Sequence, residues 1–436
     1  MRWLSMKMEL AKSRIIKVEG PAFIQVIEGS LSVLGKKMLP KESTVVPKSK
    51  VMVFEALEDS IVEVRIGEGG GLEELEDITI PPEWKIAVNK ILNMEKPMTI
   101  IVLGDVDSGK STFCTFLANQ SYSKGFKTAI IDNDLGQSDI GPPTTIGLGF
   151  LEKPVASLSV VPLFNAFFVG STSPKGLIDR VIVGARKLLD AALKERAEVI
   201  VVNTSGWISG RGARTLKLSL ALILNPKVIV AIQRSGELEH LLKPLQGLTN
   251  LEIVRIPTPR IIRARNKEER RLIRESSYSR YLTGAKTRVF SMDKVGLMFS
   301  FVGTGFPIPR EELRNYEPLV GTQLLYGEYS SDALSLVTKS DIPSEQKEQA
   351  KAFIREETGK DEVIILPQGF ERGLLAGFFN SEGRFLGIGV VKEVNFARRT
   401  IEIMTPVDED VGLIILGSVK ISESGREIRK LDPWSF

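Results

Sequence analysis

Residues 104–112, GDVDSGKST, have the types and the spacing to bind a nucleoside triphosphate. They match the phosphate-binding pattern G-x-x-x-x-G-K-[ST], and they lie between an apolar run, MTIIVL, and a stretch that predicts a helix. Gly104 and Gly109 allow backbone amides to approach phosphate oxygens at the start of that helix. Lys110 can then reach the β- and γ-phosphates, and the Ser111 hydroxyl is suited to Mg²⁺. A chance turn rich in Gly and Ser would not explain both flanks.

An acidic loop follows the next predicted strand. Asp132 ends the run TAIID, and Asp134 follows two residues later in the segment DNDLGQSDIGPP. Carboxylates at a strand end beside a phosphate-binding loop can hold Mg²⁺ through water or accept a proton from a hydroxyl. The alternative is a solvated turn rich in Asp and Gly.

Two further loops also follow predicted strands. In GSTSPKG, Ser173 and Pro174 have the types expected for the cap and first position of a helix, and that structural role could explain them. In NTSGWISGRG, Trp207 lies in a glycine-framed loop and not in an apolar run. Its ring could stack on a nucleic-acid base or simply pack within the loop, and the residues leave both interpretations open.

Basic residues are concentrated between Arg260 and Arg280. This segment has eight Lys or Arg against three Glu, a larger local surplus than the +4 of the whole chain. If the segment is helical, Arg263, Lys267, Arg270 and Arg274 lie along one stripe. A solvated charged face is the usual explanation of such a run. An arginine lid over a transferring phosphoryl group is the functional alternative.

The surrounding pattern predicts three domains. Residues 1–80 contain short alternating runs separated by turn residues, which indicates a small β-sandwich or barrel. Residues 81–290 alternate Val/Ile-rich strands with helices, which predicts a parallel sheet covered on both faces, with its ligand beyond the carboxyl ends of the strands. Residues 291–436 contain one helix and a glycine-punctuated β meander, and predict a mixed α/β domain without a catalytic constellation.

Composition excludes several classes of protein. The single cysteine, Cys114, excludes an internal disulfide and a cysteine zinc cluster, and indicates a reducing compartment. The single histidine, His240, excludes a site with several histidines. We find no apolar run of membrane-spanning length and no signal-peptide pattern, so we expect a cytoplasmic protein without membrane contact.

In their order along the chain, these motifs resemble the polynucleotide 5′-hydroxyl kinase family. The resemblance rests on the phosphate-binding loop (P-loop) with an acid at Asp107, on DNDLGQ with Asp134 and Gln137, on TSP at 172–174, on NTSGW, and on NKEERRLIRESSYSRYLTG as a lid helix. Asp105 departs from the family pattern, which often has proline there. The resemblance covers most of the chain and implies an α/β fold, with a central P-loop kinase domain, an N-terminal β-sandwich and a C-terminal mixed domain.

The same resemblance implies a reaction and a set of site residues. ATP, with Mg²⁺, would give its γ-phosphoryl group to the 5′-hydroxyl end of RNA, with DNA ends left open as acceptors. The residues placed in the reaction are Lys110, Asp134, Arg270 and Arg274. Those placed at the nucleotide are Gly104, Asp107, Ser108, Gly109, Lys110, Ser111 and Thr112, with Lys50 near the adenine and with Ser111 and Asp134 at Mg²⁺. Those placed at the RNA end are Gln137, Thr172, Ser173, Pro174 and Trp207. Protein partners are not indicated.

Two other classes compete with this interpretation. A P-loop ATPase switch of the partitioning or metal-insertion type also has an Asp at a strand end, and it needs no acceptor hydroxyl. A non-catalytic RNA-binding scaffold is disfavoured, because Lys110, Ser111 and Asp134 are all present. A GTPase is disfavoured because the chain has no N-K-x-D motif to read the base.

Overall fold

The computed structural model describes residues 3–76, 80–261 and 263–435. The chain forms two compact units, the first from residues 1–167 and 178–273, the second from 168–177 and 274–436. The N-terminal β-rich region and the P-loop region therefore belong to one unit. The division into three domains, 1–80, 81–290 and 291–436, stays a prediction.

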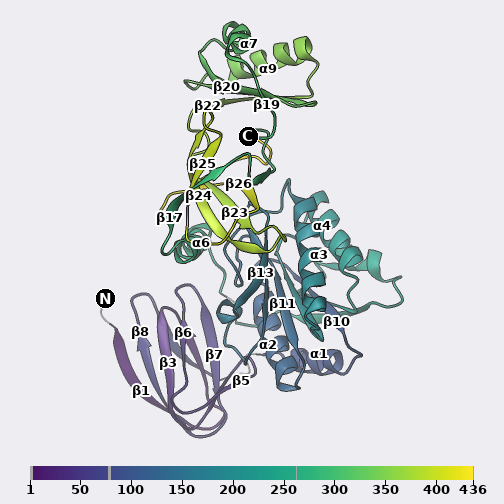
Figure 1. Cartoon of the computed structure of the whole chain (residues 1–436). Helices are drawn as coiled ribbons and strands as arrows, with labels where there is room; N and C mark the ends of the chain where they lie inside the picture. The colour runs from purple at the N-terminus through teal and green to yellow at the C-terminus, as the bar shows by residue number, and fades with distance from the viewer. Residues whose placement is uncertain (1–2, 77–79, 262, 436) are drawn as a thin grey trace. The chain divides into compact units, whose positions relative to one another are not determined.

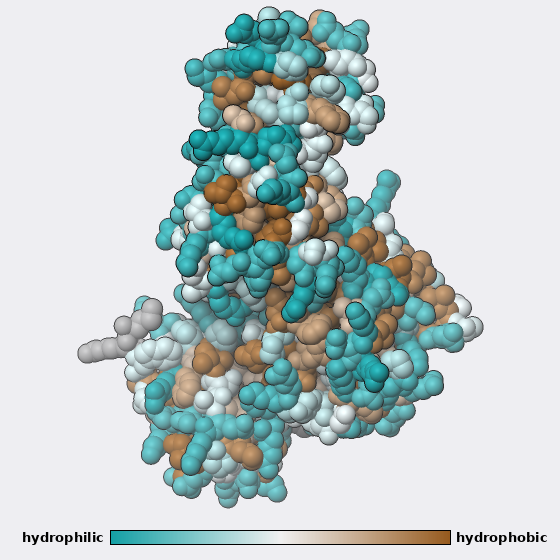
Figure 2. Space-filling view, viewed as in Figure 1, coloured by the Kyte–Doolittle hydropathy of each residue, from teal (hydrophilic) through white to brown (hydrophobic). Residues whose placement is uncertain are grey.

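The N-terminal region is a β-sandwich (Figure 1). One sheet has the strand order β1-β8-β3-β6, and the other has the order β5-β4-β7-β2-β9. Alternate residues of these strands face inward, and Ile24, Phe54 and Val64 are fully buried between the sheets. The outer face visible in Figure 2 is mostly hydrophilic. The strands are β1 (Leu4–Leu10), β2 (Ile15–Glu19), β3 (Ala22–Glu28), β4 (Leu31–Val33), β5 (Lys36–Met38), β6 (Ser43–Val46), β7 (Val51–Ala56), β8 (Ser60–Ile66) and β9 (Gly71–Leu75).

The P-loop region is built on a seven-stranded sheet with the order β13-β12-β11-β14-β10-β15-β16. Five neighbouring strands, from β11 to β16 in that order, are parallel as predicted, while β12 runs antiparallel to β11. The parallel pairing brings the carboxyl ends of β10, β11 and β14 to one edge. The strands are β10 (Met98–Gly104), β11 (Thr128–Asn133), β12 (Thr145–Phe150), β13 (Leu163–Phe168), β14 (Val199–Thr204), β15 (Val228–Gln233) and β16 (Glu252–Pro257).

Helices cover both faces of this sheet. Because successive residues of a strand face opposite ways, Ile100 and Val102 pack with α1 and α2 in one core cluster, while Ile101 faces the other layer. The helices α3 and α4 pack against each other, and α3 contacts β11 and β12. The helices of this region are α1 (Pro82–Leu92), α2 (Lys110–Ser123), α3 (Ile178–Lys194), α4 (Arg211–Leu224) and the short α5 (Glu239–Leu242). None of the helices in the described ranges is long and apolar enough to cross a membrane.

The second unit contains two sheets, β17-β25-β24-β23-β26-β18, to which β27 is added beside β26, and β19-β20-β21-β22. The predicted meander corresponds to the antiparallel strands β23, β24 and β25. Helix α6 (Lys267–Tyr281) begins in the first unit and ends in the second. The other elements are α7 (Arg310–Leu313), α8 (Glu317–Val320), α9 (Ser344–Thr358), β17 (Lys286–Ser291), β18 (Gly296–Met298), β19 (Phe306–Pro307), β20 (Leu324–Tyr329), β21 (Ala333–Thr338), β22 (Glu362–Pro367), β23 (Leu374–Phe379), β24 (Phe385–Asn395), β25 (Thr400–Thr405), β26 (Leu413–Ile421) and β27 (Glu427–Lys430).

The second unit also includes ten residues from the middle of the chain, 168–177. The Gly170 carbonyl accepts a hydrogen bond from the Ser418 N–H at 2.7 Å. The Phe168 ring lies so close to Gly377 that a Cβ on this glycine would stand 2.4 Å from the ring. This short segment is therefore packed into the C-terminal sheet.

Candidate active site

The P-loop begins at Gly104, the last residue of β10, and its Lys110, Ser111 and Thr112 start α2, as the sequence predicts. Gly109 has a φ of +92°, and a Cβ on Gly104 would lie 2.3 Å from the Ser108 Oγ, so both positions suit glycine. The Lys110 side chain is buried, and its Nζ donates a hydrogen bond to the Asp105 carbonyl at 2.6 Å. Burial lowers the pKa of Lys110, against the attraction of Asp134.

One hydroxyl of this loop has no partner. The Ser108 Oγ is buried, and within the described residues it makes no hydrogen bond. A buried polar atom without a partner costs free energy unless a ligand or water satisfies it. The loop therefore presents an unused hydrogen-bonding group beside its amides.

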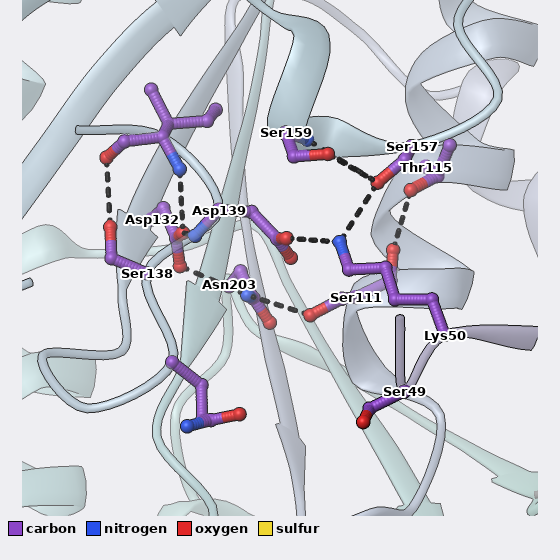
Figure 3. Close-up of polar contacts among 12 residues, drawn as sticks. Ser49, Lys50, Ser111, Thr115, Asp132, Ser138, Asp139, Ser157, Ser159 and Asn203 are labelled. Atoms are coloured by element: carbon purple, nitrogen blue, oxygen red, sulfur yellow. Dashed lines mark hydrogen bonds and ion pairs between the residues drawn. The ribbon is translucent and has the colours of Figure 1, made fainter. Parts of the chain in front are cut away.

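Asp132 lies at the end of β11 and is linked to the P-loop by a side chain that the sequence analysis did not single out (Figure 3). Asn203, near the end of β14, donates through its Nδ2 to the Asp132 Oδ1 at 3.0 Å and to the Ser111 Oγ at 3.2 Å. The Asp132 Oδ2 accepts the backbone N–H of Asp139 and of Ile140. Burial, and then repulsion from Asp139 and Asp134, raises the pKa of Asp132. Asn203 is a polar residue near the carboxyl end of an apolar strand that pairs with β10. This position was the signal that could have identified it.

Asp134 has a different environment. It is half-buried, and its Oδ1 accepts the backbone N–H groups of Gly136 and Gln137, each at 3.1 Å. These bonds form an Asx-type turn, and the role of Asp134 at Mg²⁺ or at the acceptor hydroxyl stays a prediction. The other carboxylate oxygen is not used in that turn. The two acids are therefore distinct, with Asp132 buried behind Ser111 and Asp134 at the rim of the loop.

A turn of the β-sandwich reaches the acidic loop. Between β6 and β7, Lys50 forms an ion pair with Asp139 at 2.7 Å and donates to the Ser157 Oγ at 3.1 Å (Figure 3). The neighbouring Ser49 donates through its Oγ to Glu269 of α6 at 3.1 Å. The proposed approach of Lys50 to adenine stays a prediction, and in this structure its ammonium is bonded to Asp139.

The start of the lid is bonded to the P-loop through Asp107. The Asp107 Oδ2 accepts the Arg270 guanidinium at 2.7 Å and the backbone N–H of Arg265 at 3.2 Å. Arg265 also donates to the Ser49 carbonyl and to the Gln137 side chain. Arg270 is thus held beside the phosphate-binding loop by a carboxylate that a bound triphosphate could replace.

Arg274 has other partners than Arg270, although both lie on α6. Its Nε and Nη2 donate to the two carboxylate oxygens of Glu427, at 2.5 and 2.7 Å. Both side chains are nearly buried, with 13% and 11% exposed. A two-point pair of this kind holds a guanidinium firmly. The pair anchors the second half of α6 to β27.

The segment at 172–174 does not begin a helix. Helix α3 begins at Ile178, so the expected cap at Ser173 and first position at Pro174 are wrong. The reason is the intervening Gly176, whose φ of +78° is incompatible with continuous helix. The Thr172 Oγ1 is buried and makes no hydrogen bond within the described residues.

Trp207 lies half-buried in the loop between β14 and α4. Its ring packs on Gly212, where a Cβ would stand 2.5 Å from the Trp207 Cη2. The neighbouring Gly206 passes the P-loop so closely that a Cβ there would lie 2.6 Å from the Val106 nitrogen. Packing within the loop is therefore present, and base stacking by the same ring stays a prediction.

Comparison with known proteins identifies the family. Residues 104–284 match the sequence model described as "mRNA cleavage and polyadenylation factor CLP1 P-loop". A polyribonucleotide 5′-hydroxyl-kinase of Pyrococcus furiosus is 32% identical over 357 residues, which cover 81% of this chain and 96% of the relative. That of Methanocaldococcus jannaschii is 31% identical, with 81% and 95% covered. This chain belongs to the polyribonucleotide 5′-hydroxyl-kinase family.

The family membership confirms the resemblance that the motifs indicated. A solved structure of a Clp1p–Pcf11p complex has the same fold, with a TM-score of 0.64 and 13% identity over 96% of this chain and 98% of that one. The expected fold class is likewise confirmed. Membership of a P-loop kinase family implies the use of ATP.

The kinase fold provides a fitting set of donors for Mg²⁺. Among the described residues, no three His, Cys, Asp or Glu side chains come together as a metal site. Mg²⁺ in phosphoryl-transfer enzymes is usually held by few protein groups, by water and by the substrate phosphates. The Ser111 hydroxyl, which Asn203 links to Asp132, fits that requirement, and the placing of Asp134 at Mg²⁺ stays a prediction.

Proposed function

We propose that the protein transfers the γ-phosphoryl group of ATP to the 5′-hydroxyl end of an RNA. The observation that carries the proposal is the match to polyribonucleotide 5′-hydroxyl-kinases over 95–96% of their length. The P-loop is also bonded to the lid through Asp107 and Arg270, and to the end of β11 through Ser111, Asn203 and Asp132. Phosphoryl transfer needs positioning and countercharge more than covalent chemistry, and these side chains supply both.

In this proposal the P-loop binds the triphosphate. The backbone amides between Gly104 and Lys110 face the phosphate oxygens, and the Lys110 ammonium exchanges the Asp105 carbonyl for β- and γ-oxygens. Ser111 and Thr112 would hold Mg²⁺, which would supply countercharge to the phosphates, and Asn203 and Asp132 orient the Ser111 hydroxyl.

The acceptor hydroxyl loses its proton to Asp134, whose position at the rim leaves one carboxylate oxygen outside the turn. Arg270 leaves Asp107 and covers the charge on the phosphoryl group in transfer. Arg274 was expected to act with it, but to do so it must leave Glu427. We therefore assign Arg274 to anchoring the lid helix.

The RNA-binding residues follow from the family resemblance. Gln137, the clasp at 172–174 and Trp207 would hold the terminal nucleotide, and the unpaired Thr172 hydroxyl supports a polar contact from the clasp. The solved Clp1p structure is a complex with Pcf11p, so a protein partner is a further proposal for this chain. A cytoplasmic location and the use of DNA ends also stay predictions.

One assay tests the function. The protein is incubated with γ-labelled ATP, Mg²⁺ and an oligoribonucleotide with a 5′-hydroxyl end, and the label is followed. Label on the RNA is the expected result, and the same oligonucleotide with a 5′-phosphate is the matched control that should take none. Label released only as free phosphate would instead identify the ATPase switch. The DNA oligonucleotide of the same sequence measures the choice of acceptor.

A further inference from the structure

Lys217 is a buried amine that the proposed mechanism does not use. It lies in α4, has 3% of its surface exposed, and donates through its Nζ to the Ser205 carbonyl at 2.6 Å and to the Ser205 Oγ at 3.3 Å. No carboxylate of the described residues lies within ion-pair distance of it. An ammonium buried without a counter-ion is costly, so its retention needs an explanation.

The group that Lys217 holds is the first residue of the Trp207 loop. Ser205 directly follows β14, Gly206 then touches the P-loop at Val106, and Trp207 packs on Gly212. The loop is thus pressed between the P-loop and the first turn of α4, and Lys217 is a polar anchor of its first carbonyl. A change in that hydrogen bond would alter the direction in which the Trp207 side chain points from the loop.

The charge of Lys217 responds to the nucleotide site. Burial and then the charge of Lys110 lower its pKa, Asp134 raises it, and the net pKa is about 7. Near neutral pH the side chain is therefore divided between ammonium and amine. Negative charge added at the P-loop favours the ammonium, which makes the stronger hydrogen bond to a carbonyl.

We infer that Lys217 is a positioning residue that couples an occupied P-loop to RNA binding. A bound triphosphate keeps its ammonium charged, the ammonium fixes the Ser205 carbonyl, and the Trp207 loop is then set for the terminal nucleotide. This inference rests on the proposed function, because it assumes that the Trp207 loop receives an RNA end.

The test measures binding and not transfer. A dye-labelled oligoribonucleotide with a 5′-hydroxyl end is titrated with the protein between pH 6 and 8.5, with and without a non-hydrolysable ATP analogue. In the wild type we expect RNA affinity to fall as the pH rises through about 7, and the analogue to move this fall to higher pH. Lys217→Met should remove the pH step in RNA affinity and reduce the increase in RNA affinity caused by the analogue roughly tenfold. The affinity of this variant for the analogue itself should change less than about threefold.

Arg214→Met is the matched control. It removes an exposed cation from the same helix, three residues earlier, and should leave the RNA affinity and its pH step as in the wild type. His240 is present in the wild type and in both variants, so a change seen only in Lys217→Met is not due to it.

Each outcome decides something. If Lys217→Met keeps both the pH step and the nucleotide gain, the inference is wrong even where the wild type phosphorylates RNA. If the wild type transfers no phosphate, the proposed function falls, while nucleotide-linked RNA binding still tests the role of Lys217. If Lys217→Met does not fold, the wild-type titration decides, and an affinity that is flat across this pH range overturns the inference.

Discussion

The P-loop and the Trp207 loop are built from the same parts. Each follows one of two paired parallel strands, β10 and β14, contains glycine, and leads into a helix. Each also has a buried lysine whose Nζ donates to a carbonyl of its own loop at 2.6 Å, to Asp105 from Lys110 and to Ser205 from Lys217.

The two loops differ in where the lysine lies in its helix. Lys110 is the first residue of α2 and lies beside the loop amides, so a phosphate can take the place of the carbonyl. Lys217 is almost two turns into α4, and the loop above it is closed by Gly206 against Val106. One lysine is placed to exchange its partner, and the other to keep it. The same local design can therefore bind a ligand or fix a loop.

The largest expected effect is that of Lys110→Ala. It should lower turnover roughly 10³-fold or more, because it removes a charge that the transferring phosphoryl group needs. Single-turnover transfer of labelled phosphate to RNA measures it. Lys217→Met is the matched control for removal of a buried lysine, and its turnover at saturating RNA should stay within about tenfold. Equal losses in the two variants would erase the distinction between the loops.

The next largest effects are expected at the two lid arginines, whose substitutions should change different properties. Arg270→Ala should reduce turnover roughly 10²-fold, because the guanidinium held at the P-loop by Asp107 is the one placed to cover developing charge. Arg274→Ala should instead lower the unfolding temperature, because it removes the guanidinium that contacts both carboxylate oxygens of the nearly buried Glu427. Kinetics and thermal unfolding of both variants check this assignment. If Arg274→Ala lost more turnover at saturating substrates than Arg270→Ala, with stability unchanged, Arg274 would have to be assigned a role in the reaction.

Asn203 connects the two loops, because it belongs to β14 and bonds to Ser111 of α2. Asn203→Ala should raise the Mg²⁺ concentration needed for half-maximal rate roughly tenfold, since the Ser111 hydroxyl and Asp132 lose their shared donor. Initial rates over a Mg²⁺ series measure it, beside the exposed Asn250→Ala as control. An unchanged Mg²⁺ requirement would reduce Asn203 to a structural link.

The last prediction concerns stability and pH, and not turnover. Burial holds the pKa of Lys217 near 7 in the folded chain, below its ordinary 10.5, so between these values the unfolded chain binds more protons. The wild type should therefore gain stability relative to Lys217→Met as the pH rises from 7 to 10, by up to about 1.4 kcal/mol per pH unit. Urea unfolding at three pH values measures the difference. If the free energy of unfolding changes with pH in the same way in both proteins, folding does not change the pKa of Lys217.

The sequence predicted what depends on local pattern. The P-loop, the alternation of strands and helices, and the basic lid segment follow from spacing and periodicity within short windows. The partners of Ser111 and Arg274 could not be predicted, since Asn203 and Glu427 are 92 and 153 residues away from them. Lys217 did leave a signal, because it falls on the stripe of α4 that also buries Ala213, Leu220 and Leu224.

The ten residues at 168–177 have a consequence for engineering this enzyme. They leave the nucleotide-binding half, pack against Gly377 and Ser418, and return to α3. A shortened gene that stops after α6 would strip this excursion of its partners and leave Phe168 exposed to water. The nucleotide-binding half can thus not be separated by truncating the chain at one position. Chimaeras between relatives should exchange residues 168–177 together with the carboxy-terminal half.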